Sequence, residues 1–208
     1  MGTWSDRVVP HLTDRALSRP EINELRDEVC ADLTGRVLEI GFGSGLNLRY
    51  LPTEVTSVRA VEPADAGWAL SEARRGSAGI PVERSGLDGQ SLDEADASFD
   101  SVLVTFSLCT IPDAAAALAE VHRVLRPGGR LHFLEHGLAP DPDVVRWQAR
   151  LEPVQRRLFV GCHLTRDIPA LVSGAGLEIE ELRADYGPGP RVMRPWAYGY
   201  AGRAVRRG

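Results

Sequence analysis

The sequence contains no lysine, because all 24 of its basic residues are arginine. Several enzyme mechanisms depend on a side-chain amine, including Schiff-base catalysis, the P-loop and the lysine-assisted tyrosine of short-chain dehydrogenases. The absence of lysine excludes all three.

The sequence also lacks a run of about 18 apolar residues, the length needed to span a bilayer. At the N-terminus, residues 1–14 are interrupted by Asp6, Arg7 and His11, where a signal peptide needs an unbroken apolar stretch. We therefore expect a cytoplasmic protein without a membrane anchor.

Cysteine is scarce, and Cys30, Cys109 and Cys162 are too far apart in sequence for a C-x-x-C zinc knuckle. Their odd number suits a reducing compartment. We expect free thiols in the core and predict no metal site.

The net charge of -5 comes with arginines scattered along the chain, so no basic stripe is available to neutralise phosphates. Nucleic acid is not an expected partner. A length of 208 residues with 43% hydrophobic and 25% charged residues is typical of one globular domain, residues 1–208. The composition leaves the oligomeric state open.

Residues 1–33 show a helical pattern. Pro20 can begin a helix, and apolar residues follow at spacings of three and four, namely Ile22, Leu25, Val29 and Leu33. We interpret this segment as an N-terminal helical cap or lid.

From Gly35 onward, short apolar strands alternate with amphipathic helices, which is typical of an α/β fold with a parallel sheet. The seven predicted strands are 36–40, 57–61, 80–84, 101–105, 130–135, 177–184 and 196–204. The predicted helices are 46–51, 66–75, 113–125, 143–158 and 166–173. Residues 126–129 (Arg-Pro-Gly-Gly) are expected to end one helix and turn the chain into the next strand.

The sharpest motif is a strand that runs into three alternate glycines, Val37-Leu38-Glu39-Ile40-Gly41-Phe42-Gly43-Ser44-Gly45. Glycines at this position let the backbone approach a ligand closely. A dinucleotide fingerprint expects Gly or Ala at position 46, which is Leu, and Glu39 would repel a pyrophosphate. S-adenosylmethionine carries an ammonium and a sulfonium but no phosphate, so the motif favours methyl transfer over nicotinamide chemistry.

Two further acidic positions follow the next two strands. Glu62 lies about twenty residues after the glycine turn, which suits contact with ribose hydroxyls. Asp88 and Gly89 come after the third strand, where a carboxylate and a backbone N–H can bind adenine.

Together with Ser98-Phe99-Asp100 and residues 121–129 (Val-His-Arg-Val-Leu-Arg-Pro-Gly-Gly), these motifs resemble the class I S-adenosylmethionine-dependent methyltransferases. The resemblance covers residues 35–136. It implies a Rossmann-like seven-stranded sheet of order 3-2-1-4-5-7-6, with the last strand antiparallel and helices on both faces. It also implies cofactor binding by the segment 34–136 and acceptor binding by 137–208.

The same resemblance implies specific contacts with the cofactor. Glu39 and Gly41 are expected near the methionine moiety, Glu62 at the ribose, and Asp88 and Gly89 at the adenine. The full set of expected cofactor-binding residues is Glu39, Gly41, Phe42, Gly43, Gly45, Asn47, Glu62, Pro63, Asp88, Gly89 and Thr105.

A narrower resemblance links the second half to the methyltransferase-like thiol S-methyltransferases, which methylate small alkyl thiols. It rests on Ser107-Leu108-Cys109, Glu135-His136, Arg146-Trp147-Gln148, Glu152-Pro153 and Gly161-Cys162-His163-Leu164-Thr165-Arg166. Those enzymes begin with a membrane anchor, which is not expected here. The resemblance implies a small-molecule acceptor with a thiol sulfur.

Methyl transfer from a sulfonium mainly requires alignment and a dry site. A thiol acceptor, with an ordinary pKa near 8.5, also needs a base or a positive charge nearby. The predicted catalytic residues are His136, at the end of the fifth strand, and His163 and Arg166, before the last predicted helix.

Four alternatives stay open from sequence. The acceptor could be an oxygen or nitrogen of a natural product or lipid-like molecule. The three cysteines could converge to bind arsenite for methylation. The protein could bind the cofactor without catalysis, or it could be a nicotinamide oxidoreductase.

Overall fold

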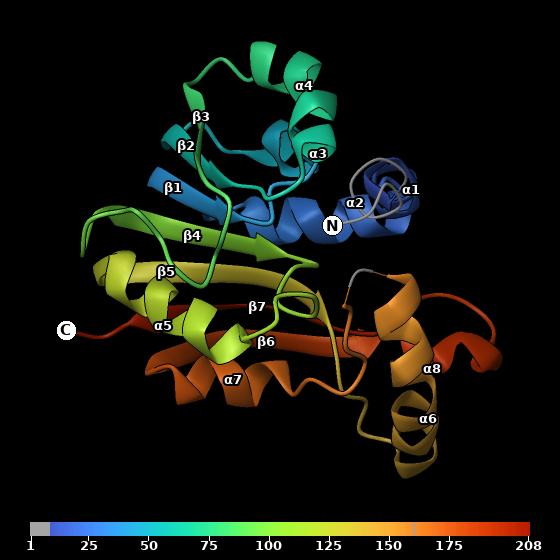
Figure 1. Ribbon diagram of the computed structural model, residues 1–208. Coiled ribbons are helices and arrows are strands. Elements are labelled where there is room, and N and C mark those ends of the chain that lie inside the picture. Colours follow the sequence, from blue (N-terminus) through green and yellow to red (C-terminus); the bar gives the residue numbers. More distant parts are fainter. Residues whose placement is uncertain (1–8, 160) are drawn as a thin grey trace.

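A computed structural model describes residues 9–159 and 161–208, so the first eight residues of the predicted cap lie outside the described part. Seven strands form one sheet of order β3-β2-β1-β4-β5-β7-β6 (Figure 1). Strand β7 is antiparallel to β5 and β6, and the other pairings are parallel. The predicted order and direction are confirmed. The strands are β1 Gly35–Ile40, β2 Val55–Val61, β3 Val82–Gly86, β4 Phe99–Thr105, β5 Leu125–His136, β6 Leu177–Tyr186 and β7 Tyr198–Arg206.

Helices cover both faces of the sheet. They are α1 Val9–Leu17, α2 Pro20–Cys30, η2 Leu46–Tyr50, α3 Asp65–Leu70, α4 Glu72–Gly76, α5 Ala114–Val124, α6 Pro142–Leu158, α7 Ile168–Gly174, η3 Arg191–Met193 and α8 Arg194–Ala197. In Figure 1, α5 and α7 lie together along one side of the sheet, and α2 lies on the other.

Neighbouring residues of the central strands enter two separate cores, because successive side chains of a strand point to opposite faces. Leu38, Val104 and Phe133 pack in the core that α5 and α7 cover. Their chain neighbours, Val37, Leu103 and Leu134, pack in the core that α2 and η2 cover. The continuous apolar strands are therefore those of a sheet buried on both sides.

Helix α2 is a fixed part of the second core. Its residues Arg26, Val29 and Cys30 are buried, and Cys30 has no exposed surface. Helix α1 is tied to the glycine loop, because Asp14 accepts a hydrogen bond from Ser44 Oγ at 2.5 Å and pairs with Arg74 at 3.0 Å.

Three local predictions need correction. The predicted helix 66–75 is broken at Ser71, whose hydroxyl donates to the Trp68 carbonyl and so competes with the helical backbone pattern. The segment after the glycines is a 3₁₀ helix rather than an α-helix. Residues 126–129 lie within β5 as an irregularity, because Leu125 pairs with Phe99 and Arg130 with Ser101.

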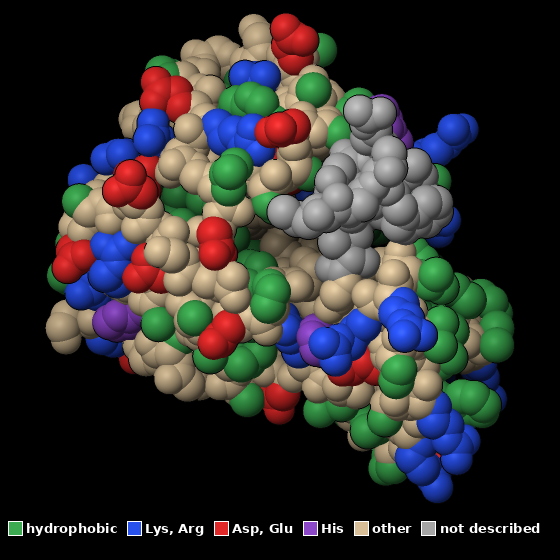
Figure 2. Space-filling model, in the orientation of Figure 1, with side chains coloured by type: hydrophobic (Ala, Val, Ile, Leu, Met, Phe, Trp, Pro, Cys, Tyr) green, Lys and Arg blue, Asp and Glu red, His purple; other side chains and the backbone are tan. Residues whose placement is uncertain are grey.

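On the upper left of the face drawn in Figure 2, arginine and acidic side chains are interspersed, whereas at the lower right arginines lie among hydrophobic side chains. Within residues 9–159 and 161–208, no helix is both long enough and apolar enough to cross a membrane.

The loop before β4 is held by one carboxylate that binds three strands. Glu94 accepts hydrogen bonds from Arg36 at 3.3 Å, Arg59 at 3.0 Å and Ser85 at 2.7 Å, on β1, β2 and β3 respectively. Burial opposes ionisation of Glu94, but these donors outweigh it and hold the pKa of Glu94 below its ordinary value.

We expect Glu94→Gln to lower the free energy of unfolding by about 1–2 kcal/mol near neutral pH, because the arginines lose a charged acceptor. A depressed folded-state pKa gives stability that is present above the ordinary pKa of 4.5 and is lost as the pH falls below it. The difference between the two proteins should therefore shrink in acid. Denaturant titrations at a series of pH values measure it.

Glu83→Gln is the matched control, because Glu83 also pairs with Arg59 but its side chain is 65% exposed. An exposed pair of this kind contributes less than about 1 kcal/mol. Equal effects of the two variants, or a Glu94→Gln effect that does not change with pH, contradict the interpretation.

Candidate functional site

The glycine loop leaves β1 through three left-handed residues, with φ of 75° at Gly41, 57° at Gly43 and 75° at Gly45. A side chain at Gly41 would collide with Ser107, since its Cβ would lie 1.8 Å from Oγ. At Gly43 the nearest atom to such a Cβ is 4.0 Å away. The loop is therefore closely packed at its start and open at Gly43, where a ligand can approach the backbone.

Phe42 does not present its side chain to this opening. Its ring packs against Trp68 with the ring centroids 5.5 Å apart, and its N–H donates to the Val61 carbonyl. A Cβ at Gly45 would touch the same ring. Phe42 therefore belongs to the core beneath the loop.

Glu39 lies at the end of β1 and is 1% exposed. Its Oε1 accepts from Asn47 Nδ2 at 2.8 Å, and the same amide donates to Thr105 Oγ1 at 3.0 Å. Arg26 Nη1 donates to Asn47 Oδ1 at 2.5 Å and to Thr105 at 3.1 Å. The structure thus brings together the predicted residues Glu39, Asn47 and Thr105.

The second oxygen of this carboxylate, Glu39 Oε2, is buried and has no hydrogen-bond partner within the described chain. Burial raises the pKa of Glu39 to about 8, while Asn47 and Arg26 act in the opposite direction. Such an oxygen is suited to a cationic ligand, because a buried carboxylate needs a partner.

Arg26 was missed by sequence reasoning, although a signal for it exists. It lies four residues after Ile22 and three before Val29, on the apolar stripe of α2. A charged residue within such a stripe is buried with the stripe, so it needs a buried partner.

Glu62 directly follows β2 and holds the glycine loop. Its carboxylate accepts from the N–H of Gly43 at 2.6 Å and of Ala64 at 2.7 Å. Burial raises the pKa of Glu62, whereas the two backbone hydrogen bonds and the charge of nearby Arg84 act to lower it. Pro63 is exposed.

Asp88 and Gly89 lie beyond β3 and differ in burial. Asp88 is exposed, and its carboxylate accepts from the backbone and side chain of Gln90 at 2.9 and 2.8 Å. Gly89 is buried against the side chain of Ile40 at the end of β1. Only Gly89 is packed against the central strands.

The loop after β4 begins at Phe106, a bulky residue with φ of 52°. The turn lets the N–H groups of Ser107, Leu108 and Cys109 donate to the buried carboxylate of Glu135, at 2.7, 2.9 and 3.3 Å. Burial raises the pKa of Glu135 to about 7, with these amides opposing the shift. Phe106 and Glu135 therefore fix the loop beside the glycine turn.

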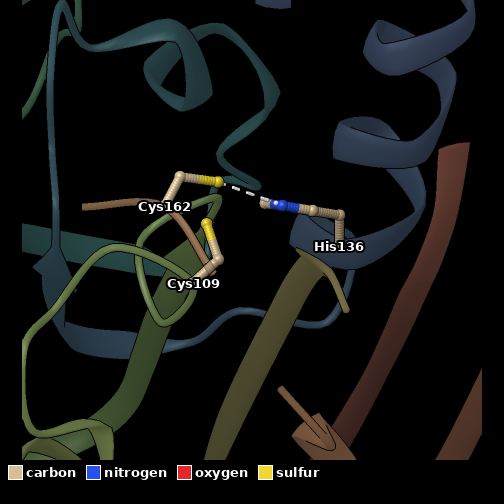
Figure 3. Close-up of side chains that lie close together, drawn as sticks. All are labelled: Cys109, His136 and Cys162. Carbon is tan, nitrogen blue, oxygen red and sulfur yellow. Dashed lines mark hydrogen bonds between the residues drawn. The ribbon is translucent and has the colours of Figure 1, made fainter. Parts of the chain in front are cut away.

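His136 follows Glu135 and approaches two cysteines (Figure 3). Its Nε2 lies 3.1 Å from Cys162 Sγ, and the donor atoms of Cys109, His136 and Cys162 all lie within 4.8 Å of one another. Hydrogen bonds from Cys109 and then His136 lower the pKa of Cys162 despite burial. Burial opposes the charged form of His136, but Cys162 and Glu135 outweigh it and raise the pKa of His136.

His163 and Arg166 lie in the same chain segment as Cys162 but bind other groups. His163 Nδ1 lies 2.9 Å from Glu152 Oε1. The backbone N–H of His163 donates to the Cys109 carbonyl at 2.8 Å. Arg166 donates to the carbonyls of Leu108 and Pro112. Both residues thus brace the loop after β4.

The cysteines do not converge as one group of three. Cys109 and Cys162 meet, whereas Cys30 is buried in the core that α2 covers. The expectation of free thiols holds for all three, but sequence spacing did not reveal the Cys109–His136–Cys162 cluster.

Comparisons with known proteins identify the family of this chain. A methyltransferase domain family matches residues 38–133. Thiol S-methyltransferase TMT1B of Rattus norvegicus is 32% identical, covering 98% of this chain and 86% of that protein. Ubiquinone biosynthesis O-methyltransferase of Pseudomonas syringae is 29% identical, covering 54% of this chain and 51% of that protein.

Among solved structures, a SAM-dependent methyltransferase from Methanosarcina mazei superimposes with a TM-score of 0.65 at 23% identity, covering 83% of this chain and 92% of that chain. That likeness concerns the fold. The family match and the relative that covers nearly the whole chain also identify the protein family. The chain therefore belongs to the class I S-adenosylmethionine-dependent methyltransferases and is an enzyme that uses this cofactor.

Proposed function

We propose that the protein methylates the sulfur of a small thiol. The observation that carries the proposal is the Cys109–His136–Cys162 cluster, in which both cysteines are buried and His136 is half-buried, in a chain similar over nearly its whole length to a thiol S-methyltransferase. A thiolate acceptor needs a proton acceptor and a neighbouring positive charge, and an imidazole can act as either.

The residues at the end of β1 fit the cofactor. We assign the Glu39 oxygen that has no partner among the described residues to the cofactor's ammonium group, the open backbone at Gly43 to its methionine moiety, and Glu62 to its ribose. Glu62 already accepts two backbone amides, but each carboxylate oxygen has a second lone pair for a hydroxyl donor. Asp88 and Gly89 are assigned to the adenine.

Arg26 is a positioning residue in this scheme. It holds Asn47 and Thr105, and through Asn47 it orients Glu39. Since the cationic ligand binds the other oxygen of Glu39, the network fixes a carboxylate that points at the ligand without filling the opening.

S-adenosylmethionine supplies a methyl group on a sulfonium, an activated leaving group that needs no protonation. The protein's task is then to hold the acceptor in line and remove its proton. We assign proton removal to His136, acting directly or through Cys162 at 3.1 Å. His163 and Arg166 support the acceptor side by bracing the loop that carries Ser107 and Cys109. The segment 34–136 binds the cofactor, and 137–208 completes the acceptor side.

An oxygen or nitrogen acceptor is the second candidate, favoured by the similarity to an O-methyltransferase. Alcohols and amines differ from thiols in acidity, so they require bases of different strength for deprotonation. The two candidates therefore separate in a direct assay.

The acceptor assay measures S-adenosylhomocysteine release with matched thiols, alcohols, phenols and amines, followed by mass spectrometry of the products. We expect turnover with small alkyl thiols and none with alcohols of the same carbon skeleton. Turnover confined to phenols or amines overturns the thiol assignment and leaves the cofactor assignment standing.

Replacing the proposed base tests its role. His136→Gln should lower kcat for the thiol by about 10²–10⁴-fold, the usual contribution of general base catalysis, with cofactor affinity unchanged. His122→Gln is the control, because His122 lies on α5 against Gly176. Equal kcat values for His136→Gln and the wild type would remove His136 from the mechanism.

On the cofactor side, Glu62→Ala should weaken S-adenosylmethionine binding by at least about tenfold, because a charge-assisted contact with the ribose is lost. Isothermal titration calorimetry measures the affinity. Glu72→Ala, at an exposed carboxylate on α4, is the control. Since Glu62 also holds the glycine loop, thermal unfolding of each variant must accompany the titration. Unchanged affinity in a folded Glu62→Ala protein excludes the ribose contact.

A further inference from the structure

Three ligand-type side chains meet at one point, two of them buried and His136 half-buried, although they stand at positions 109, 136 and 162 of the sequence. Cys109 comes from the loop after β4, His136 from the end of β5, and Cys162 from the segment between α6 and α7 (Figure 3). Their donor atoms lie within 4.8 Å of one another. Cys109 is 2% exposed and Cys162 is 6% exposed.

Two hydrogen bonds that leave the sulfur atoms and His136 Nε2 free fix the three segments to one another. The N–H of His163 donates to the Cys109 carbonyl at 2.8 Å and joins the two cysteine segments. Glu135 binds the N–H of Cys109 and precedes His136 in β5. Gln155 Nε2 approaches Cys162 Sγ at 3.6 Å, as an outer group that can orient a sulfur ligand.

We propose that Cys109, His136 and Cys162 bind one zinc-class divalent cation. Tetrahedral zinc with two sulfurs at about 2.3 Å and one nitrogen at about 2.0 Å requires donor separations of roughly 3.5–3.8 Å. The observed cluster reaches that spacing with side-chain shifts below about 1 Å, because no pair exceeds 4.8 Å. The sequence predicted no metal site, since the cluster exists only in the folded chain.

Charge and donor type select the class of ion. Two thiolates and a neutral imidazole balance the charge of a divalent cation, which matters at a buried position. Sulfur and imidazole donors suit zinc, whereas magnesium and calcium require oxygen ligands.

The nearby carboxylates are engaged elsewhere. Glu135 accepts three backbone amides, and Glu152 binds His163 and Thr165. Three protein ligands leave a fourth position of the ion for water or a small exogenous ligand, as in zinc sites that are not purely structural.

The ion would use the same side chains that the proposed function gives to proton removal. Zinc and an acceptor proton would therefore compete for them. Binding of the ion is measured without cofactor or acceptor, so its outcome does not depend on which acceptor the enzyme uses.

The test uses the full chain, reduced with a phosphine and freed of metal by dialysis against a chelator. Calorimetric titration with Zn²⁺ should show one equivalent bound. Titration with Co²⁺ should give the visible bands of a tetrahedral site and a sulfur-to-cobalt charge-transfer band. The absence of stoichiometric Zn²⁺ binding, or a Co²⁺ spectrum without thiolate bands, overturns the proposal on wild-type protein alone.

Variants then assign the ligands. Cys109→Ser, Cys162→Ser and His136→Gln should each weaken Zn²⁺ binding by at least about a hundredfold, more than the loss of an outer-shell partner. Cys30→Ser is the matched control and should bind as the wild type does, because Cys30 lies in the other core. Circular dichroism checks that each variant is folded. Wild-type affinity in folded Cys109→Ser and Cys162→Ser proteins, or its loss in Cys30→Ser, places the ion elsewhere and overturns the proposal.

Discussion

The carboxylate of Glu39 is buried at the end of β1, where an unpaired charge is costly, and much of the site is arranged around it. Asn47 satisfies one oxygen, and Arg26 supplies a buried positive charge from α2. The glycine loop is consequently held at both ends, by Glu39 before it and Asn47 after it. The N-terminal helix that sequence suggested as a cap or lid is joined to the sheet by the same network, so α2 is part of the site's framework.

A second buried carboxylate, Glu135, is the penultimate residue of β5 and has a different role. Both oxygens of Glu135 accept hydrogen bonds from backbone amides of the loop after β4, three in all. In contrast, Oε2 of Glu39 has no hydrogen-bond partner among the described residues. One carboxylate is thus available to a ligand and the other shapes the wall beside it. Two glutamates near the ends of two parallel strands therefore have different roles, since Glu39 is available to a ligand and Glu135 positions a loop. Only their hydrogen-bond partners distinguish the two residues.

Sequence reasoning predicted the strands, the glycine loop and Glu39, because these follow local patterns of apolar residues and glycine spacing. The sheet order was implied by the resemblance to the class I methyltransferases. Helix 66–75 was predicted unbroken because Ser71 acts through one side-chain bond that periodicity does not report. The Cys109–His136–Cys162 cluster could not be predicted, since it depends on how three distant loops pack. His163 and Arg166 were selected for their charge, and their partners are carbonyls and Glu152, which only the fold brings near.

Phe106 turns the chain out of β4 in a left-handed conformation that costs a bulky side chain about 1–3 kcal/mol. This backbone conformation places Ser107 against Gly41 and lets the N–H groups that follow donate to Glu135. Glycine or asparagine accepts such a conformation more readily, so the chain has not been optimised for stability at this position. Selection for a more heat-resistant protein and selection for an ordered loop after β4 therefore act in opposite directions on a single residue.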